Sequence, residues 1–119
     1  MKRILIVEDV DMNRDLLAQI LEEEYEVLEA VDGNDGYKKA LEEKPDLILM
    51  DNLMPGMTGN EATAALRKHP EMQDTPIIAV TAQAMAGAAD AAIEAGCTDY
   101  VSKPIDEDIL IEKIQKYIG

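Results

Sequence analysis

Residues 46–55 read Asp-Leu-Ile-Leu-Met-Asp-Asn-Leu-Met-Pro and carry the strongest signal for the fold class. Its apolar residues, 47–50, run without a break into Asp51, and Pro55 closes the stretch. A short apolar run without alternation is typical of a parallel strand that helices cover on both faces. Asp51 then lies where the strand ends and a loop begins. Because ligands of open parallel α/β sheets bind at that edge, we expect Asp51 to belong to a functional site.

The rest of the chain repeats this pattern of an apolar run followed by a helical segment. Apolar runs predict strands at residues 4–7, 25–30, 47–50, 77–80 and 98–101. Helical spacing of apolar residues predicts a helix after each strand, the last two at 84–95 and 106–118. Strict alternation of strands and helices indicates an α/β fold, a five-stranded parallel sheet wound with helices on both faces.

Several local signals predict where the helices begin and which faces they bury. Asp11 is expected to cap the first helix, and residues 32–36 are expected to form a turn before the second. Gly87 would lie inside the fourth helix, at a cost of about 1 kcal/mol relative to alanine. The buried face of the first helix is expected to carry Leu16, Leu17, Ile20 and Leu21.

Composition narrows the class of protein. The 119 residues suit a single domain, expected to span residues 1–119 without an output domain. A hydrophobic content of 47% with only 3% aromatic residues predicts an aliphatic core. The net charge of −14 argues against direct binding to nucleic acid or anionic membranes. The single cysteine, the lack of a signal peptide and the lack of a long apolar segment predict a cytoplasmic protein without membrane insertion.

Polar side chains follow four of the expected strands. Glu8 and Asp9 follow the first strand, Asp51 the third, Thr81 the fourth and Lys103 the fifth. In a parallel sheet these ends lie along one edge. Three carboxylates at close range repel one another without a cation, and their oxygens suit a hard divalent ion such as Mg²⁺. An ammonium and a hydroxyl beside them suit a phosphoryl group.

These residue types, in this order, resemble the receiver domain of two-component response regulators over the chain from Ile4 to the last helix. The resemblance implies a flavodoxin-like or CheY-like strand order of 2-1-3-4-5. It also implies that Asp51 is the phosphoacceptor, which forms an acyl phosphate. Mg²⁺, with Mn²⁺ as a substitute, would be held directly by Asp9, through water by Glu8, and also by Asp51 and the backbone carbonyl of Leu53.

The same resemblance implies a switch. Thr81 and Lys103 would each hold a phosphoryl oxygen, and Tyr100 would move inward as Thr81 shifts. The Lys103–Pro104 peptide bond would be cis. The face formed by the fourth helix, fifth strand and fifth helix would then change shape and bind a downstream protein. The phosphodonor would be a histidine kinase or histidine phosphotransferase, and the domain would be a monomer or a phosphorylation-dependent dimer.

The sequence departs from the commoner receiver pattern directly after the acceptor. Asn52 is polar where an aliphatic residue is common, and Leu53 is apolar where a polar side chain is common. An apolar side chain at position 53 would orient an attacking water less well, so we expect a comparatively long-lived acyl phosphate.

The same residues fit three other functions less well. A flavodoxin-like cofactor binder needs a phosphate loop after the first strand, where Glu8 and Asp9 would repel a phosphate. A haloacid-dehalogenase-type phosphatase has a second aspartate at the position that Leu53 occupies here. A degenerate receiver would lack one of the required residues, and all are present. The chain could act as a stand-alone receiver or be part of a longer regulator or hybrid kinase.

Overall fold

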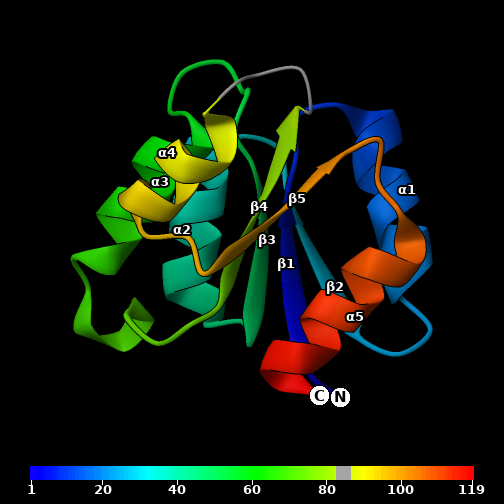
Figure 1. Ribbon diagram of the computed structural model, residues 1–119. Coiled ribbons are helices and arrows are strands. Elements are labelled where there is room, and N and C mark those ends of the chain that lie inside the picture. The colour runs from blue at the N-terminus through cyan, green and yellow to red at the C-terminus, as the bar shows by residue number, and fades with distance from the viewer. Residues whose placement is uncertain (83–86) are drawn as a thin grey trace.

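The computed structural model describes residues 1–82 and 87–119 and shows one sheet between two layers of helices (Figure 1). The described residues form five parallel strands in the order β2-β1-β3-β4-β5, which confirms the predicted fold class and topology. The strands are β1 (Arg3–Val7), β2 (Glu26–Ala30), β3 (Leu47–Asp51), β4 (Ile77–Ala82) and β5 (Asp99–Lys103).

Helices cover both faces of this sheet, as Figure 1 shows. One face is covered by α1 (Asp11–Leu21) and α5 (Glu107–Ile118), and the other by α2 (Gly33–Glu43), α3 (Gly59–Arg67) and α4 (Ala88–Ala95). A 3₁₀ turn, η1 (Pro70–Met72), lies between α3 and β4. The part of the chain that the structure describes contains no helix long and apolar enough to cross a membrane.

The central strand β3 is buried along its whole length, as its unbroken apolar run predicts. Its side chains alternate between two cores, because successive side chains of a strand point to opposite faces. Ile48 and Met50 pack on the side of α2, α3 and α4. Leu47 and Leu49 pack on the side of α1 and α5. Two aliphatic cores therefore fix both faces of the strand that ends at Asp51.

The starts of three helices differ from the predictions. Asp11 is the first residue of α1 rather than its cap, and Val10, which holds the cap position, makes no side-chain capping hydrogen bond. Residues 32–36 are not a separate turn: the Asp32 side chain accepts from Asp35 N, and α2 begins at Gly33. Gly87 does not lie inside α4 but precedes it with φ +79°, a conformation that glycine adopts readily. The predicted helical residues 84–86 lie outside the described part of the chain.

Two further predictions were partly wrong. Leu16 does not belong to the buried face of α1, because 53% of it is exposed while Leu17 and Leu21 are buried. Strand β5 begins one residue later than predicted and continues through Lys103, so that this lysine is the last residue of the strand. That extension places the Lys103 side chain at the same sheet edge as Asp51.

Candidate functional site

Strand pairing brings the predicted site residues together at one edge of the sheet. In the parallel register, Asp51 lies opposite Val80 and Ala82 lies opposite Lys103. Glu8 and Asp9 follow the last residue of β1, which pairs with Met50. The side chains of Glu8 and Asp51 are buried although both are acidic, with 1% and 5% of each residue exposed.

Three carboxylates and one ammonium form the centre of the site. One carboxylate oxygen from each of Glu8, Asp9 and Asp51 lies within 4.8 Å of the other two. Lys103 Nζ lies 3.3 Å from Asp51 Oδ1 and 3.4 Å from Glu8 Oε1. A single ammonium offsets only part of the negative charge of three buried or half-buried carboxylates.

The donor set and its hydrogen bonding fit a hard divalent cation. Asp9 Oδ1 is buried and has no hydrogen-bond partner among the described residues, and an unpaired buried oxygen is costly unless a ligand meets it. Burial and the neighbouring Glu8 carboxyl raise the pKa of Asp9. Burial acts to lower the pKa of Lys103, but the charges of Asp51 and Glu8 outweigh it and raise that pKa. The ammonium therefore stays charged beside the acidic cluster.

Thr81 and Tyr100 lie beside this centre with a hollow between them. Thr81 is buried, and its hydroxyl donates to the carbonyl of Val101 at 3.4 Å. A cavity of about 150 Å³ is lined by Thr81, Tyr100 and Ser102, together with the start of α4. Tyr100 has 38% of its surface exposed, and Lys113 Nζ lies 5.0 Å from the centre of its ring.

The other residues implied by the resemblance lie near the same edge. Leu53 is in the loop after β3, with 56% of the residue exposed. The Lys103–Pro104 peptide bond is cis, as expected.

Comparison with known proteins identifies the family. The model of the response regulator receiver domain matches residues 4–115 of the chain. The chain belongs to the response regulator receiver domain family. Residues outside the match are the first three and the last four, so this assignment covers nearly the whole chain.

Related receiver domains occur in proteins of very different length. The chain is 40% identical to the polar-differentiation response regulator DivK of Brucella anthropi, over 99% of this chain and 97% of DivK. It is 44% identical to a segment of hybrid signal transduction histidine kinase G of Dictyostelium discoideum, over 97% of this chain but 4% of that kinase. A solved receiver domain of a Pseudomonas aeruginosa sensor histidine kinase, with a magnesium ion coordinated in its active site cleft, has a TM-score of 0.92 and 34% identity, over 99% of this chain and 98% of that one.

Several hydrogen bonds at the start of α3 were not predicted from the sequence. Asn52 does not simply face solvent: its Oδ1 accepts from Asn60 N at 3.0 Å and its carbonyl from Gly59 N at 3.2 Å. Thr58 and Glu61 form a reciprocal capping box at the start of α3, and the Thr-x-x-Glu spacing was a signal that could have predicted it. The two hydrogen bonds of Asn52 attach the start of α3 to the residue after Asp51.

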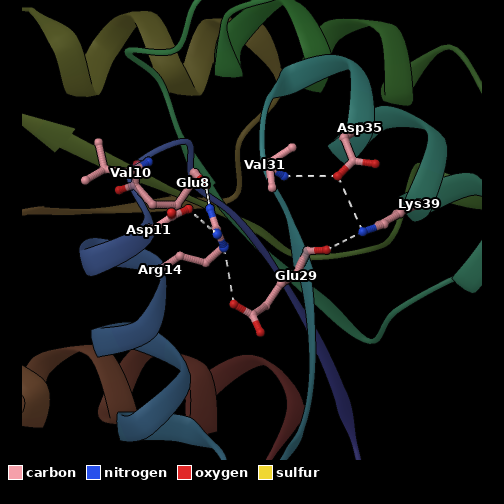
Figure 2. Close-up of polar contacts among 8 residues, drawn as sticks. All are labelled: Glu8, Val10, Asp11, Arg14, Glu29, Val31, Asp35 and Lys39. Atoms are coloured by element: carbon pink, nitrogen blue, oxygen red, sulfur yellow. Dashed lines mark hydrogen bonds and ion pairs between the residues drawn. The ribbon is translucent and has the colours of Figure 1, made fainter.

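Arg14 was missed as well, and its sequence context gives no signal for its contacts. Its guanidinium donates to the carbonyl of Glu8 at 2.9 Å, hydrogen-bonds the carboxylate of Asp11 and pairs with Glu29 at 3.3 Å, as Figure 2 shows. Only the folded chain brings the end of β1, the first turn of α1 and strand β2 around one side chain.

Proposed function

We propose that this receiver domain accepts a phosphoryl group on Asp51 from a histidine kinase or histidine phosphotransferase and passes the signal to a downstream protein. The observation that carries the proposal is the position of Lys103, whose Nζ lies 3.3 Å from the buried Asp51 carboxylate. This geometry places the nucleophilic carboxylate of Asp51 beside the Lys103 ammonium, which can hold an oxygen of the incoming phosphoryl group. The domain is a signalling module whose chemistry is limited to its own phosphorylation and slow dephosphorylation.

A divalent ion belongs to this proposal. Asp9, Asp51 and the backbone carbonyl of Leu53 would bind Mg²⁺ or Mn²⁺ directly, with Glu8 acting through water. When bound, the ion offsets negative charge on the carboxylates and on the phosphoryl group. The unpartnered oxygen of Asp9 supports this assignment. The magnesium ion in the similar Pseudomonas aeruginosa receiver domain also supports it.

The residues of the chain perform the transfer by position and charge. An oxygen of Asp51 attacks phosphorus in line with the phosphohistidine nitrogen; the new O–P bond forms as the N–P bond breaks, and the imidazole leaves with the bonding electron pair. Lys103 holds one phosphoryl oxygen, and the Thr81 hydroxyl donates a hydrogen bond to another. Such a transfer needs mainly orientation and electrostatic stabilisation.

The same step drives the switch. Among the described residues, the Thr81 hydroxyl hydrogen-bonds the carbonyl of Val101 over a long distance of 3.4 Å, so it can turn to a phosphoryl oxygen at small cost. Tyr100 then turns into the cavity of about 150 Å³ beside Thr81. This movement changes the surface formed by α4, β5 and α5, which binds the downstream protein.

The surface beside the site supports a protein as phosphodonor. A cavity of about 260 Å³ opens between α1 and the segment after β5, and Lys103 lies at its edge. Its apolar lining includes Leu16, Val80 and Ile105. An exposed leucine beside an apolar hollow offers apolar surface that a partner's side chain can bury. Lys103, which also lines this hollow, lies 3.3 Å from Asp51.

Intact-mass analysis tests the phosphoacceptor. The parent is incubated with acetyl phosphate and Mg²⁺ and is expected to gain one phosphoryl group, and Asp51→Asn none. Asp46→Asn is the matched control, because Asp46 lies at the opposite end of the same strand segment and accepts from Arg3 N. That variant should be labelled like the parent. A parent that gains no mass, or Asp51→Asn that gains mass at the same rate, contradicts the proposal.

A further inference from the structure

The peptide between Glu8 and Asp9 must hold two acidic side chains beside a third. Hydrogen bonds made by the main chain and side chain of Glu8 fix the position of this peptide. Glu8 N donates to the carbonyl of Ala30 at 3.1 Å, and Glu8 Oε2 accepts from Val10 N at 3.2 Å. The carbonyl oxygen of Glu8 accepts from Arg14 Nη1 at 2.9 Å. Asp9 Oδ1, by contrast, has no partner in the described residues.

Arg14 is well placed to hold that carbonyl in one direction. Only 12% of its side chain is exposed, and its guanidinium is held on its other sides by Asp11 and Glu29 (Figure 2). The guanidinium is planar and carries donors in a fixed fork, so several acceptors define its orientation. Because the peptide unit is planar, fixing the Glu8 carbonyl also fixes the direction in which the chain continues to Asp9.

Glu29 is itself held by neighbouring residues. Its carbonyl accepts from Lys39 Nζ at 2.6 Å, and Lys39 also pairs with Asp35 of α2 at 3.4 Å (Figure 2). The support of Arg14 therefore reaches from α1 to β2 and α2, elements that the packed core keeps in place. A guanidinium attached at several points to a rigid frame can resist the repulsion between neighbouring carboxylates.

We propose that Arg14 is a positioning residue for the divalent-ion site, which fixes the Glu8–Asp9 peptide so that the Asp9 carboxylate faces the ion. The inference rests on the proposed function, because it takes the acidic cluster as the ion site. Arg14 acts through the peptide and does not touch the ion. Groups that orient metal ligands in this way typically change metal affinity by about 10- to 100-fold when they are removed.

The test is the affinity of the unphosphorylated protein for Mn²⁺, measured by titration with detection of free Mn²⁺ by electron paramagnetic resonance. Arg14→Gln is expected to weaken binding by at least about tenfold. Simple charge predicts the opposite sign: removing a positive charge from a protein of net charge −14 should strengthen cation binding. Weaker binding would therefore report lost geometry rather than altered charge.

Arg3→Gln is the matched control. Arg3 also joins two carboxylates and a carbonyl, those of Glu26 and Glu43, but at the other end of β1. Arg3→Gln should lower the unfolding temperature by a similar amount to Arg14→Gln and leave the affinity for Mn²⁺ unchanged. Arg14→Lys keeps the charge without the fork and should bind Mn²⁺ with intermediate affinity, which serves as the test if the glutamine variant does not fold.

The possible outcomes distinguish a failure of the role of Arg14 from a failure of the proposed phosphoacceptor function. Parent-like Mn²⁺ affinity in folded Arg14→Gln or Arg14→Lys overturns the role of Arg14 and leaves the proposed function standing. An equal loss of affinity in Arg3→Gln also overturns it, because the loss would then reflect general destabilisation. A parent that binds no Mn²⁺ contradicts the ion site itself.

Discussion

The substitution Gly59→Ala should have two opposing effects on stability, one from the helix preference of alanine and one from tertiary packing. Gly59 is the first residue of α3, and a Cβ built there lies 2.2 Å from the carbonyl oxygen of Asp51 and 2.9 Å from Asn52 Cα. Alanine is favoured over glycine by up to about 1 kcal/mol in a helix interior. The two effects therefore predict opposite signs for the change in the free energy of unfolding.

The packing effect should be larger. Ordinary contact begins at 3.4 Å, so the Asp51 carbonyl or the start of α3 must move by about 1.2 Å. The obstructing atom belongs to the backbone of a fully buried strand, which cannot yield as a flexible side chain would. Overpacking of this kind costs about 1–3 kcal/mol, and the helix preference is weaker at a first helical position. We expect a net loss of about 1–2 kcal/mol, which lowers the unfolding temperature by roughly 4 °C for each kcal/mol.

Urea unfolding measures this difference, with Ala64→Gly as the reference for helix preference alone. Ala64 lies on the exposed side of the same helix, and its replacement should lower stability by about 1 kcal/mol. Because the displaced atom belongs to Asp51, Gly59→Ala should also slow labelling by acetyl phosphate. If Gly59→Ala is as stable as the parent or more stable, the close approach does not constrain this position.

Three other changes test separate parts of the molecule. Burial acts to raise the pKa of Asp99, but hydrogen bonds from Lys113, Tyr100 N and Tyr117 outweigh it and lower that pKa. Asp99→Asn should therefore lower the free energy of unfolding by about 1–2 kcal/mol at pH 7. In urea unfolding, this difference from the parent should disappear as the pH falls below 3.8, the ordinary pKa of the group, because the Asp99 carboxylate then becomes protonated in both states. Leu16→Glu should slow phosphoryl transfer from a histidine kinase roughly tenfold, which corresponds to the loss of one apolar contact with the kinase. Equal slowing of the reaction with acetyl phosphate would contradict a docking role for Leu16. Leu53→Asn should shorten the lifetime of the acyl phosphate in Mg²⁺, and an unchanged or longer lifetime refutes the role given to the apolar side chain.

The central strands could be predicted because their signal is local. Strands β1, β3 and β4 are continuous apolar runs, since both faces of each are covered by helices. The polar residues that follow those runs predicted the site, because parallel strands end at a common edge. The structure brings Glu8, Asp9, Asp51 and Lys103 together as expected, while their proposed roles in phosphotransfer stay predictions.

Helix boundaries were predicted less well because several residues there are compatible with two different local structures. Glycine and aspartate at 32–36 favour a turn by composition, but Asp32 caps a helix whose glycines pack against other segments. A Cβ at Gly36 would lie 2.7 Å from Val7 of β1, a contact that no local pattern reveals. Leu16 has helical spacing for burial, yet nothing in the described structure covers it fully.

The amino-acid sequence alone predicted the alternation of strands and helices, the aliphatic character of the core and the identity of the residues at the strand ends. These features depend on the period of apolar residues and on chain order, which are local and additive. Three contacts follow only from the packed fold: Arg14 reaches the carbonyl of Glu8, Gly59 lies against Asp51, and Tyr100 lines a cavity beside Thr81. Such contacts join different helices and strands, and their geometry follows only once these elements have packed.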